Sequence, residues 1–318
     1  MARAIKSALK VAVPLGFSAA AERTRLSVPS EDGFLRFLAE LIGAPPEQLP
    51  TPALLAGNPA VAGRRFVLLL FNAQQQPVAV VKAGASAAAR QLIRAEAEIL
   101  TRLPPDLAGR PRLLSTFESE RVQALALEYC VGDSPRTHDP HQISSVLASW
   151  VDARTSLRFE EIPAWRRLVQ SAGEIPVFRR VAAALQSRTV RPVIYHGDFA
   201  PWNIKVTREG QTWNVLDWER GELIGVPGWD WFHYAIQNGI LVRRLPARAL
   251  AAQVDSLLAS APFLAYAEKA GVAGIEKPLV IAYLAYNAEV LRPAEGLGTG
   301  RQLLELLMKQ WLAGPTPR

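Results

Sequence analysis

The chain contains a single cysteine, Cys130, among its 318 residues, so no disulfide can form within it. A chain without disulfides is typical of a reducing compartment, and we therefore expect a cytoplasmic protein. Histidines are also few, at positions His138, His141, His196 and His233, and none of them stands in a zinc-ligand pattern such as H-E-x-x-H. These absences argue against a disulfide-stapled secreted domain and against the common kinds of zinc enzyme.

Glycine-rich nucleotide motifs and long apolar runs are missing as well. The sequence holds neither G-x-x-x-x-G-K-[ST] nor G-x-G-x-x-G, which argues against the P-loop and Rossmann folds. No apolar run approaches the length of about 18 residues that a membrane span needs, so no span is expected. Residues 1–28 partly match a secretory signal, but Pro14 and Gly16 interrupt the apolar stretch, and we interpret the segment as a basic N-terminal leader.

Charge is scattered along the chain instead of clustered. Lys and Arg number 36 against 29 Asp and Glu, which gives a net charge of +7. There is no run of five basic residues and no alternation of basic and aromatic residues, so no nucleic-acid partner is expected. We interpret the charge as surface solvation that would help to capture an anionic nucleotide. With 49% hydrophobic and 20% charged residues, the chain has an ordinary globular composition and is long enough for two domains.

What the sequence does contain is a pattern of polar residues between positions 193 and 219. A short apolar run leads to H-G-D-x-x-x-x-N, in which Asp198 is followed five residues later by Asn203. Residues 204–216 then indicate a β-hairpin whose second strand ends at Asp217. A carboxylate that can accept a hydroxyl proton, a neutral amide oxygen and a second carboxylate are the groups that phosphoryl transfer from a metal nucleotide requires.

Each of these residues taken alone is also typical of a turn, a helix cap or a strand end. Together the two motifs resemble those of the aminoglycoside phosphotransferase and choline kinase family, which has a protein-kinase-like fold and uses H-G-D-x-x-x-x-N and D-[WFH]-E. The resemblance implies that Asp198 is the catalytic base and that Asn203 and Asp217 bind Mg²⁺. It also implies that Glu219 completes the second motif.

Two residues beside these motifs are interpreted as structural. His196 is expected to orient the loop by hydrogen bonding. Asp230 lies in a G-x-x-x-x-D stretch that fits the same family, and we expect it to tie down the loop below the site.

The chain upstream is expected to supply a nucleotide-binding lobe. Residues 65–71 and 77–82 indicate two antiparallel strands around a polar turn, and an amphipathic helical segment follows at residues 87–103. By resemblance, Lys82 contacts the nucleotide phosphates, and its helix partner is Glu96, which fits the family pattern better than the competing glutamate two residues later. A solvated strand end is the ordinary alternative for such a lysine.

Residues 122–129 indicate a further strand that ends at a hinge. By resemblance, the residues that would meet the adenine edge are Glu128, Tyr129, Cys130 and Val131. We assign no chemistry to the cysteine thiol. Residues 57–63, where the family covers the phosphates, contain only two glycines, so ATP and GTP both remain candidates.

The expected fold class is α+β, a protein-kinase-like two-lobed fold with a small antiparallel-sheet N-lobe and a larger, mainly helical C-lobe. The leader would be followed by the nucleotide-binding lobe with its hinge at residues 29–133 and by the catalytic and acceptor-binding lobe at residues 134–318. Apolar residues at helical spacing predict helices over residues 31–41, 143–157, 164–172, 177–186, 245–259, 278–291 and 300–312.

The sequence thus predicts an ATP- or GTP-dependent phosphotransferase, with Mg²⁺, that acts on a hydroxyl of a sugar, aminoglycoside, amino alcohol or similar acceptor. Acidic residues in the acceptor-side region form no obvious cluster, so a neutral acceptor fits as well as a cationic one. The alternative is a catalytically silent kinase-like scaffold or nucleotide-binding module, which the glycine-poor loop favours. A protein kinase is disfavoured because no A-P-E segment follows Asp217.

Overall fold

The computed structural model describes residues 32–45, 52–56, 63–135, 139–173, 175–209, 212–293 and 296–312, so the predicted leader and most of the stretch 57–63 lie outside it. The chain divides into two compact units, Met1–Pro50 and Thr51–Arg318. In the first unit, helix α2 (Gly33–Leu41) begins at Asp32, whose side chain accepts hydrogen bonds from two backbone N–H groups of the first turn. Helix α2 is the described part of the helix predicted over residues 31–41.

A five-stranded antiparallel sheet in the order β1-β2-β3-β5-β4 opens the second unit. Its strands are β1 (Ala53–Ala56), β2 (Phe66–Phe71), β3 (Pro77–Gly84), β4 (Leu113–Glu118) and β5 (Gln123–Glu128). The predicted strand pair is confirmed as β2 and β3, and its turn is held by Asn72, whose Oδ1 accepts the N–H groups of Gln74 and Gln76. Strands β1 and β4 were not predicted.

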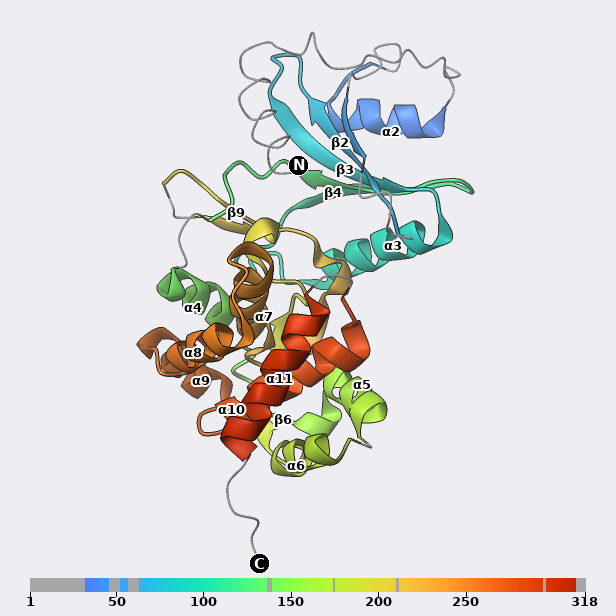
Figure 1. Ribbon diagram of the computed structural model, residues 1–318. Helices are drawn as coiled ribbons and strands as arrows, with labels where there is room; N and C mark the ends of the chain where they lie inside the picture. The colour runs from blue at the N-terminus through green and yellow to red at the C-terminus, as the bar shows by residue number, and fades with distance from the viewer. Residues whose placement is uncertain are drawn as a thin grey trace, which may run out of the picture. The chain divides into compact units, whose positions relative to one another are not determined.

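Helix α3 (Ala87–Arg102) lies against this sheet and contacts β3 and β5 (Figure 1). It begins at Ser86, whose side chain accepts the N–H of Ala89. Gly84 allows the close approach of strand and helix, because a Cβ there would lie 2.7 Å from the Cβ of Ala89. The buried face of α3 includes Ile93 and Glu96, which places a carboxylate on the sheet side of the helix.

Three short antiparallel strand pairs follow and carry the loops of the site. They are β6 (Leu157–Arg158) with β7 (Thr189–Val190), β8 (Val193–Tyr195) with β11 (Glu222–Gly225), and β9 (Ile204–Val206) with β10 (Trp213–Val215). The predicted hairpin is confirmed as β9 and β10. Short 3-10 turns are η2 (Phe159–Glu161), η3 (Pro201–Asn203) and η4 (Trp218–Arg220).

The remainder of the described chain is mainly helical. The helices are α4 (Pro140–Ser149), α5 (Pro163–Ala172), α6 (Pro176–Leu185), α7 (Trp229–Gln237), α8 (Ala247–Leu258), α9 (Ala261–Ala270), α10 (Glu276–Tyr286) and α11 (Leu297–Leu312), with π-helical turns η5 (Asn238–Val242) after α7 and η6 (Asn287–Leu291) after α10. Two corrections are needed. The helix predicted over 143–157 ends at Ser149, because Asp152 instead forms a turn by accepting from Arg154 and Thr155. Helices α7 and α9 were missed.

One hydrophobic core connects the sheet with the helices. It extends from Ile93 of α3 and Leu125 of β5 to Trp165 of α5, Phe232 of α7 and Tyr283 of α10. The predicted α+β arrangement, with a small antiparallel sheet followed by a larger helical part, is thereby observed. Within the part of the chain that the structure describes, no helix combines the length and the apolar character that crossing a membrane demands.

Candidate active site

Asp198 lies on the loop between β8 and η3. At the start of the loop Gly197 adopts a left-handed backbone (φ 79°), and a Cβ there would lie 2.8 Å from Arg220 Cβ. At the end of the loop the Asn203 side chain folds back. Its Nδ2 donates to the carbonyl oxygen of Asp198 and to Asp198 Oδ2, both at 2.9 Å. The five-residue spacing therefore lets the amide at one end of the loop hold the carboxylate at the other.

His196 ties this loop to the segment that leads to Asp217. Its Nε2 donates to the carbonyl of Leu216 at 2.9 Å, and its Nδ1 accepts the backbone N–H of Asp198 at 3.2 Å. The ring is therefore neutral, and burial lowers its pKa to about 4. A backbone bond of 2.7 Å from Leu216 N to the Asn203 carbonyl adds a second link. The two sequence motifs are thus fixed to one another.

Asp230, at the start of α7, braces the same loop. Its carboxylate accepts the backbone N–H of His196 at 2.8 Å and that of Gly197 at 3.0 Å. Burial raises the pKa of this carboxyl group to about 7 in spite of the two hydrogen bonds. The contacts go to backbone atoms only, which is the structural arrangement expected for this residue.

Lys82 and Glu96 form a buried ion pair that also reaches Asp217. Lys82 Nζ donates to Glu96 Oε1 at 2.6 Å and Oε2 at 2.8 Å, and to Asp217 Oδ1 at 2.5 Å. Of the two competing helix glutamates, Glu96 is the partner, whereas Glu98 is exposed. Burial by itself would lower the pKa of the Lys82 ammonium, but the charges of Glu96 and Asp217 outweigh it and raise the pKa. The lysine is therefore charged.

Asp217 stands at the point where β10 gives way to η4, with a left-handed backbone (φ 69°). Burial acts to raise the pKa of its carboxyl group, but the charge and hydrogen bond of Lys82 prevail and lower it. An ionised carboxylate at this position is a suitable ligand for a hard cation.

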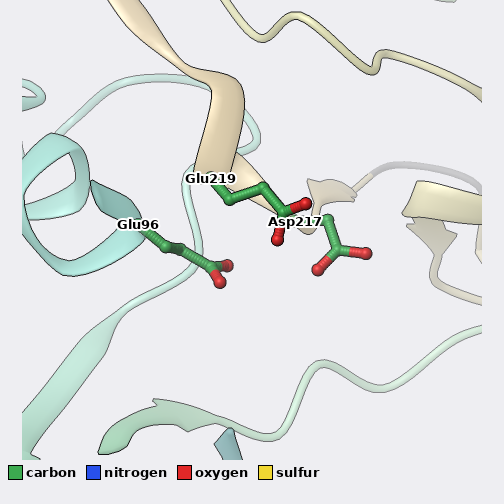
Figure 2. Close-up of side chains that lie close together, drawn as sticks. All are labelled: Glu96, Asp217 and Glu219. Carbon is green, nitrogen blue, oxygen red and sulfur yellow. The ribbon is translucent and has the colours of Figure 1, made fainter. Parts of the chain in front are cut away.

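Three carboxylates lie close together at this place (Figure 2). One ligand oxygen from each of Glu96, Asp217 and Glu219 lies within 4.8 Å of the others, with Glu96 projecting from α3 and the other two from the start of η4. The Glu96 carboxylate is already occupied, since besides Lys82 it accepts the backbone N–H of Trp218 at 3.3 Å. Glu219 forms an ion pair with Arg65 at the start of β2. Asp217 therefore remains the most available carboxylate of the three.

His233 was given no role by the sequence, yet it contacts Asp198. Its Nε2 lies 2.9 Å from Asp198 Oδ1. Burial acts to raise the pKa of Asp198, but the hydrogen bond with His233 and the nearby charge of Arg220 help to outweigh it, and the pKa is lowered. The signal was the position of His233 three residues after Asp230, which on a helix places both on one face. It could not be used because helix α7 had not been recognised.

The predicted hinge begins at Glu128, the last residue of β5, and continues through Tyr129, Cys130 and Val131. The N–H of Glu128 donates to the carbonyl of Arg112, and the N–H of Tyr129 to that of Val78. Cys130 is half-buried and burial raises its thiol pKa, whereas Val131 is 65% exposed. The segment continues to Asp133, which pairs with Val206 of β9.

Comparison with known proteins identifies the family. The model of the phosphotransferase enzyme family matches residues 17–268, a range that includes Lys82, the hinge and both motifs. No curated protein matches the sequence significantly.

Solved structures show the same fold. A thermostable mutant of the aminoglycoside phosphotransferase APH(4)-Ia, in ternary complex with ADP and hygromycin B, has a TM-score of 0.54 at 10% identity, and the match covers 90% of this chain and 100% of that one. The streptomycin–ATP complex of APH(2")-IIa has a TM-score of 0.50 at 13% identity, covering 89% and 97%. The Plasmodium vivax ethanolamine kinase has a TM-score of 0.50 at 11% identity, covering 80% and 82%.

These comparisons confirm the predicted family and fold class. The chain belongs to the phosphotransferase enzyme family and has the fold of the solved phosphotransferases and kinases to which it is similar.

Proposed function

We propose that the enzyme transfers the γ-phosphoryl group of ATP, or GTP, to a hydroxyl group of a small acceptor such as a sugar, an aminoglycoside or an amino alcohol. The observation that carries the proposal is the contact of 2.5 Å between Lys82 Nζ, held by Glu96, and Asp217 Oδ1. The loop with Asp198 and Asn203 is bonded to the same segment. Phosphoryl transfer depends mainly on positioning and charge stabilisation, and these groups supply both.

The nucleotide would be held at two places. Lys82 would bind its phosphates, since burial between carboxylates keeps the ammonium charged. At the hinge the N–H groups of Glu128 and Tyr129 are already donated within the sheet. A purine edge would therefore meet the backbone groups of Cys130 and Val131, with the exposed Val131 side chain offering apolar surface.

Asn203 and Asp217 fit a magnesium site. Both hydrogen bonds of the Asn203 side chain use its nitrogen, so its amide oxygen is available as a neutral ligand. Asp217 offers a carboxylate whose lowered pKa keeps it ionised. Mg²⁺ bound there with the nucleotide would neutralise charge on the phosphates.

Asp198 would serve as the base. Its lowered pKa keeps it ionised at neutral pH, so it can accept the proton of the acceptor hydroxyl. As the acceptor oxygen forms its bond to the γ-phosphorus, the bond from that phosphorus to the bridging oxygen breaks, and the nucleoside diphosphate leaves. Because this chemistry consumes a nucleoside triphosphate, we place the enzyme in the cytoplasm.

The test is nucleotide consumption by the purified full chain, with Mg²⁺ and either ATP or GTP, across a panel of candidate acceptors. Solved relatives bind hygromycin B and streptomycin, and another is named an ethanolamine kinase, so hydroxylated amines belong in the panel beside neutral sugars. Asp198→Ala should reduce acceptor-dependent turnover by about 100- to 10,000-fold, whereas Asp106→Ala, at an exposed position, should leave it unchanged.

Asp217→Ala should also weaken binding of the magnesium nucleotide, which Asp198→Ala should largely preserve. Full turnover in Asp198→Ala would refute the proposed mechanism. A wild-type chain that binds no nucleotide would instead support the silent-scaffold alternative.

A further inference from the structure

The catalytic loop rests against helix α7 through two side chains that lie one helical turn apart. Asp230 accepts the backbone N–H groups at the start of the loop. His233, three residues later, contacts not the backbone but the Asp198 carboxylate, at 2.9 Å from Oδ1. The ring is enclosed, with 4% of the residue exposed, so its contacts are set by the residues packed around it.

The other nitrogen of His233 faces two residues of the α10 region. Tyr283 Oη is 3.1 Å from His233 Nδ1, and Asn287 Nδ2 donates to Tyr283 Oη at 3.2 Å. Burial raises the pKa of the Tyr283 phenol, so its hydroxyl keeps its proton. The phenol oxygen has Asn287 and Gln237 as hydrogen-bond partners, and a phenol hydrogen directed at Nδ1 satisfies the remaining contact. In that arrangement the proton of a neutral His233 lies on Nε2, directed at Asp198.

Each oxygen of the Asp198 carboxylate therefore has its own hydrogen-bond partner. Asn203 Nδ2 lies 2.9 Å from Oδ2, and His233 Nε2 lies 2.9 Å from Oδ1. The terminal torsion of an aspartate is otherwise broad, so one donor alone would leave the plane of the carboxylate free to rotate. Two donors from different elements, the loop itself and α7, define that plane. A base held in this way presents the same face to every acceptor hydroxyl.

We propose that His233, oriented by Tyr283 and Asn287, is a positioning residue that fixes the Asp198 carboxylate for proton acceptance. This inference rests on the proposed function of Asp198 as the base. His233 acts through Asp198 and needs no contact with nucleotide or acceptor. Its loss should therefore lower kcat and leave the affinity for nucleotide intact.

The kinetic test compares His233→Leu with His233→Gln. Leucine removes the donor, and kcat should fall by about 10- to 100-fold, the usual effect of losing a hydrogen bond to a charged group, with the nucleotide KM within about twofold of wild type. The terminal amide nitrogen of glutamine can occupy the place of imidazole Nε2, so His233→Gln should recover most of the lost kcat. Tyr283→Phe keeps the aromatic packing but removes the hydroxyl that faces His233 Nδ1, so the tautomer of His233 is no longer fixed. We expect a smaller decrease of kcat than in His233→Leu.

Two results would overturn the inference. One is wild-type kcat in His233→Leu. The other is equal loss in the Gln and Leu variants when circular dichroism shows both to be folded, because a merely structural role would not distinguish them.

A second measurement does not depend on turnover. In the wild-type protein with ¹⁵N-labelled histidine, the NMR spectrum should show His233 as the neutral tautomer protonated on Nε2, and Tyr283→Phe should shift it towards a mixture. A wild-type ring protonated on Nδ1 would also overturn the inference. Failure of the proposed function is recognised separately, as wild-type protein with the expected tautomer but without Asp198-dependent turnover.

Discussion

Acidification should destabilise the protein through His196, because the folded chain holds this ring neutral. The ring is fully buried, and burial lowers its pKa from 6.5 to about 4. In the unfolded chain it takes up a proton near its ordinary pKa, so the stability that it contributes is present above that pKa and is lost as the pH falls towards the folded value. The difference between the two pKa values is worth about 3 kcal/mol in all, of which about 2 kcal/mol is lost between pH 7 and pH 5.

Urea unfolding of the wild type and of His196→Gln at about pH 7, 6 and 5 measures this effect. Glutamine does not titrate and can still donate to the Leu216 carbonyl, but it leaves the N–H of Asp198 without its acceptor, a cost of about 1–3 kcal/mol at every pH. The wild type should therefore be more stable at pH 7, and its advantage should shrink by about 2 kcal/mol at pH 5.

Asp230 acts in the opposite direction. Its raised pKa contributes stability at low pH that is lost as the pH rises through about 7. This contribution is present in both proteins and cancels in their difference. A stability difference between wild type and His196→Gln that stays constant from pH 7 to pH 5 would refute the reasoning.

Three further substitutions address other parts of the site. Lys82→Met removes the ion-pair partner of Glu96 and Asp217 and the proposed phosphate contact, so kcat/KM should fall by about 100-fold or more with a native circular dichroism spectrum; near-wild-type kcat/KM would contradict the role of the lysine. Arg65→Gln breaks the ion pair with Glu219, and because this pair joins β2 to η4 the nucleotide KM should rise by about two- to fivefold; an unchanged KM would show that the pair does not support nucleotide binding. Gly132→Ala places a Cβ against a backbone carbonyl of β9 at φ 136°, so the Tm should fall by several degrees, and an unchanged Tm would show that the hinge backbone can move aside.

Several of the predicted elements have one buried face. The buried residues of β2 lie two positions apart and those of helix α3 follow helical spacing, so the period of the sequence matches the structure. The last four residues of β3 are all buried, and this strand was recognised from its valine-rich run after a polar turn. Helix α7 was missed because all nine of its residues are buried, which removes the polar face that makes a helix recognisable. Because this helix was not recognised, the contact of His233 with Asp198 was not predicted either.

Sequence alone was enough to predict the family, the α+β order of elements and the residue pairing of the H-G-D-x-x-x-x-N loop. The bond from Asn203 to Asp198 appeared only in the structure, although it joins residues five positions apart in one loop. The choice of Glu96 as the partner of Lys82 was predicted from the family pattern, and the structure has the same pair. The folded structure was needed to show that the lysine also reaches Asp217, 135 residues away, and that His233 and Tyr283 lie next to Asp198. The physical reason is that these contacts, and the pKa shifts that accompany them, depend on which faces of separate elements pack together and exclude water. Residue spacing along the chain does not specify that packing.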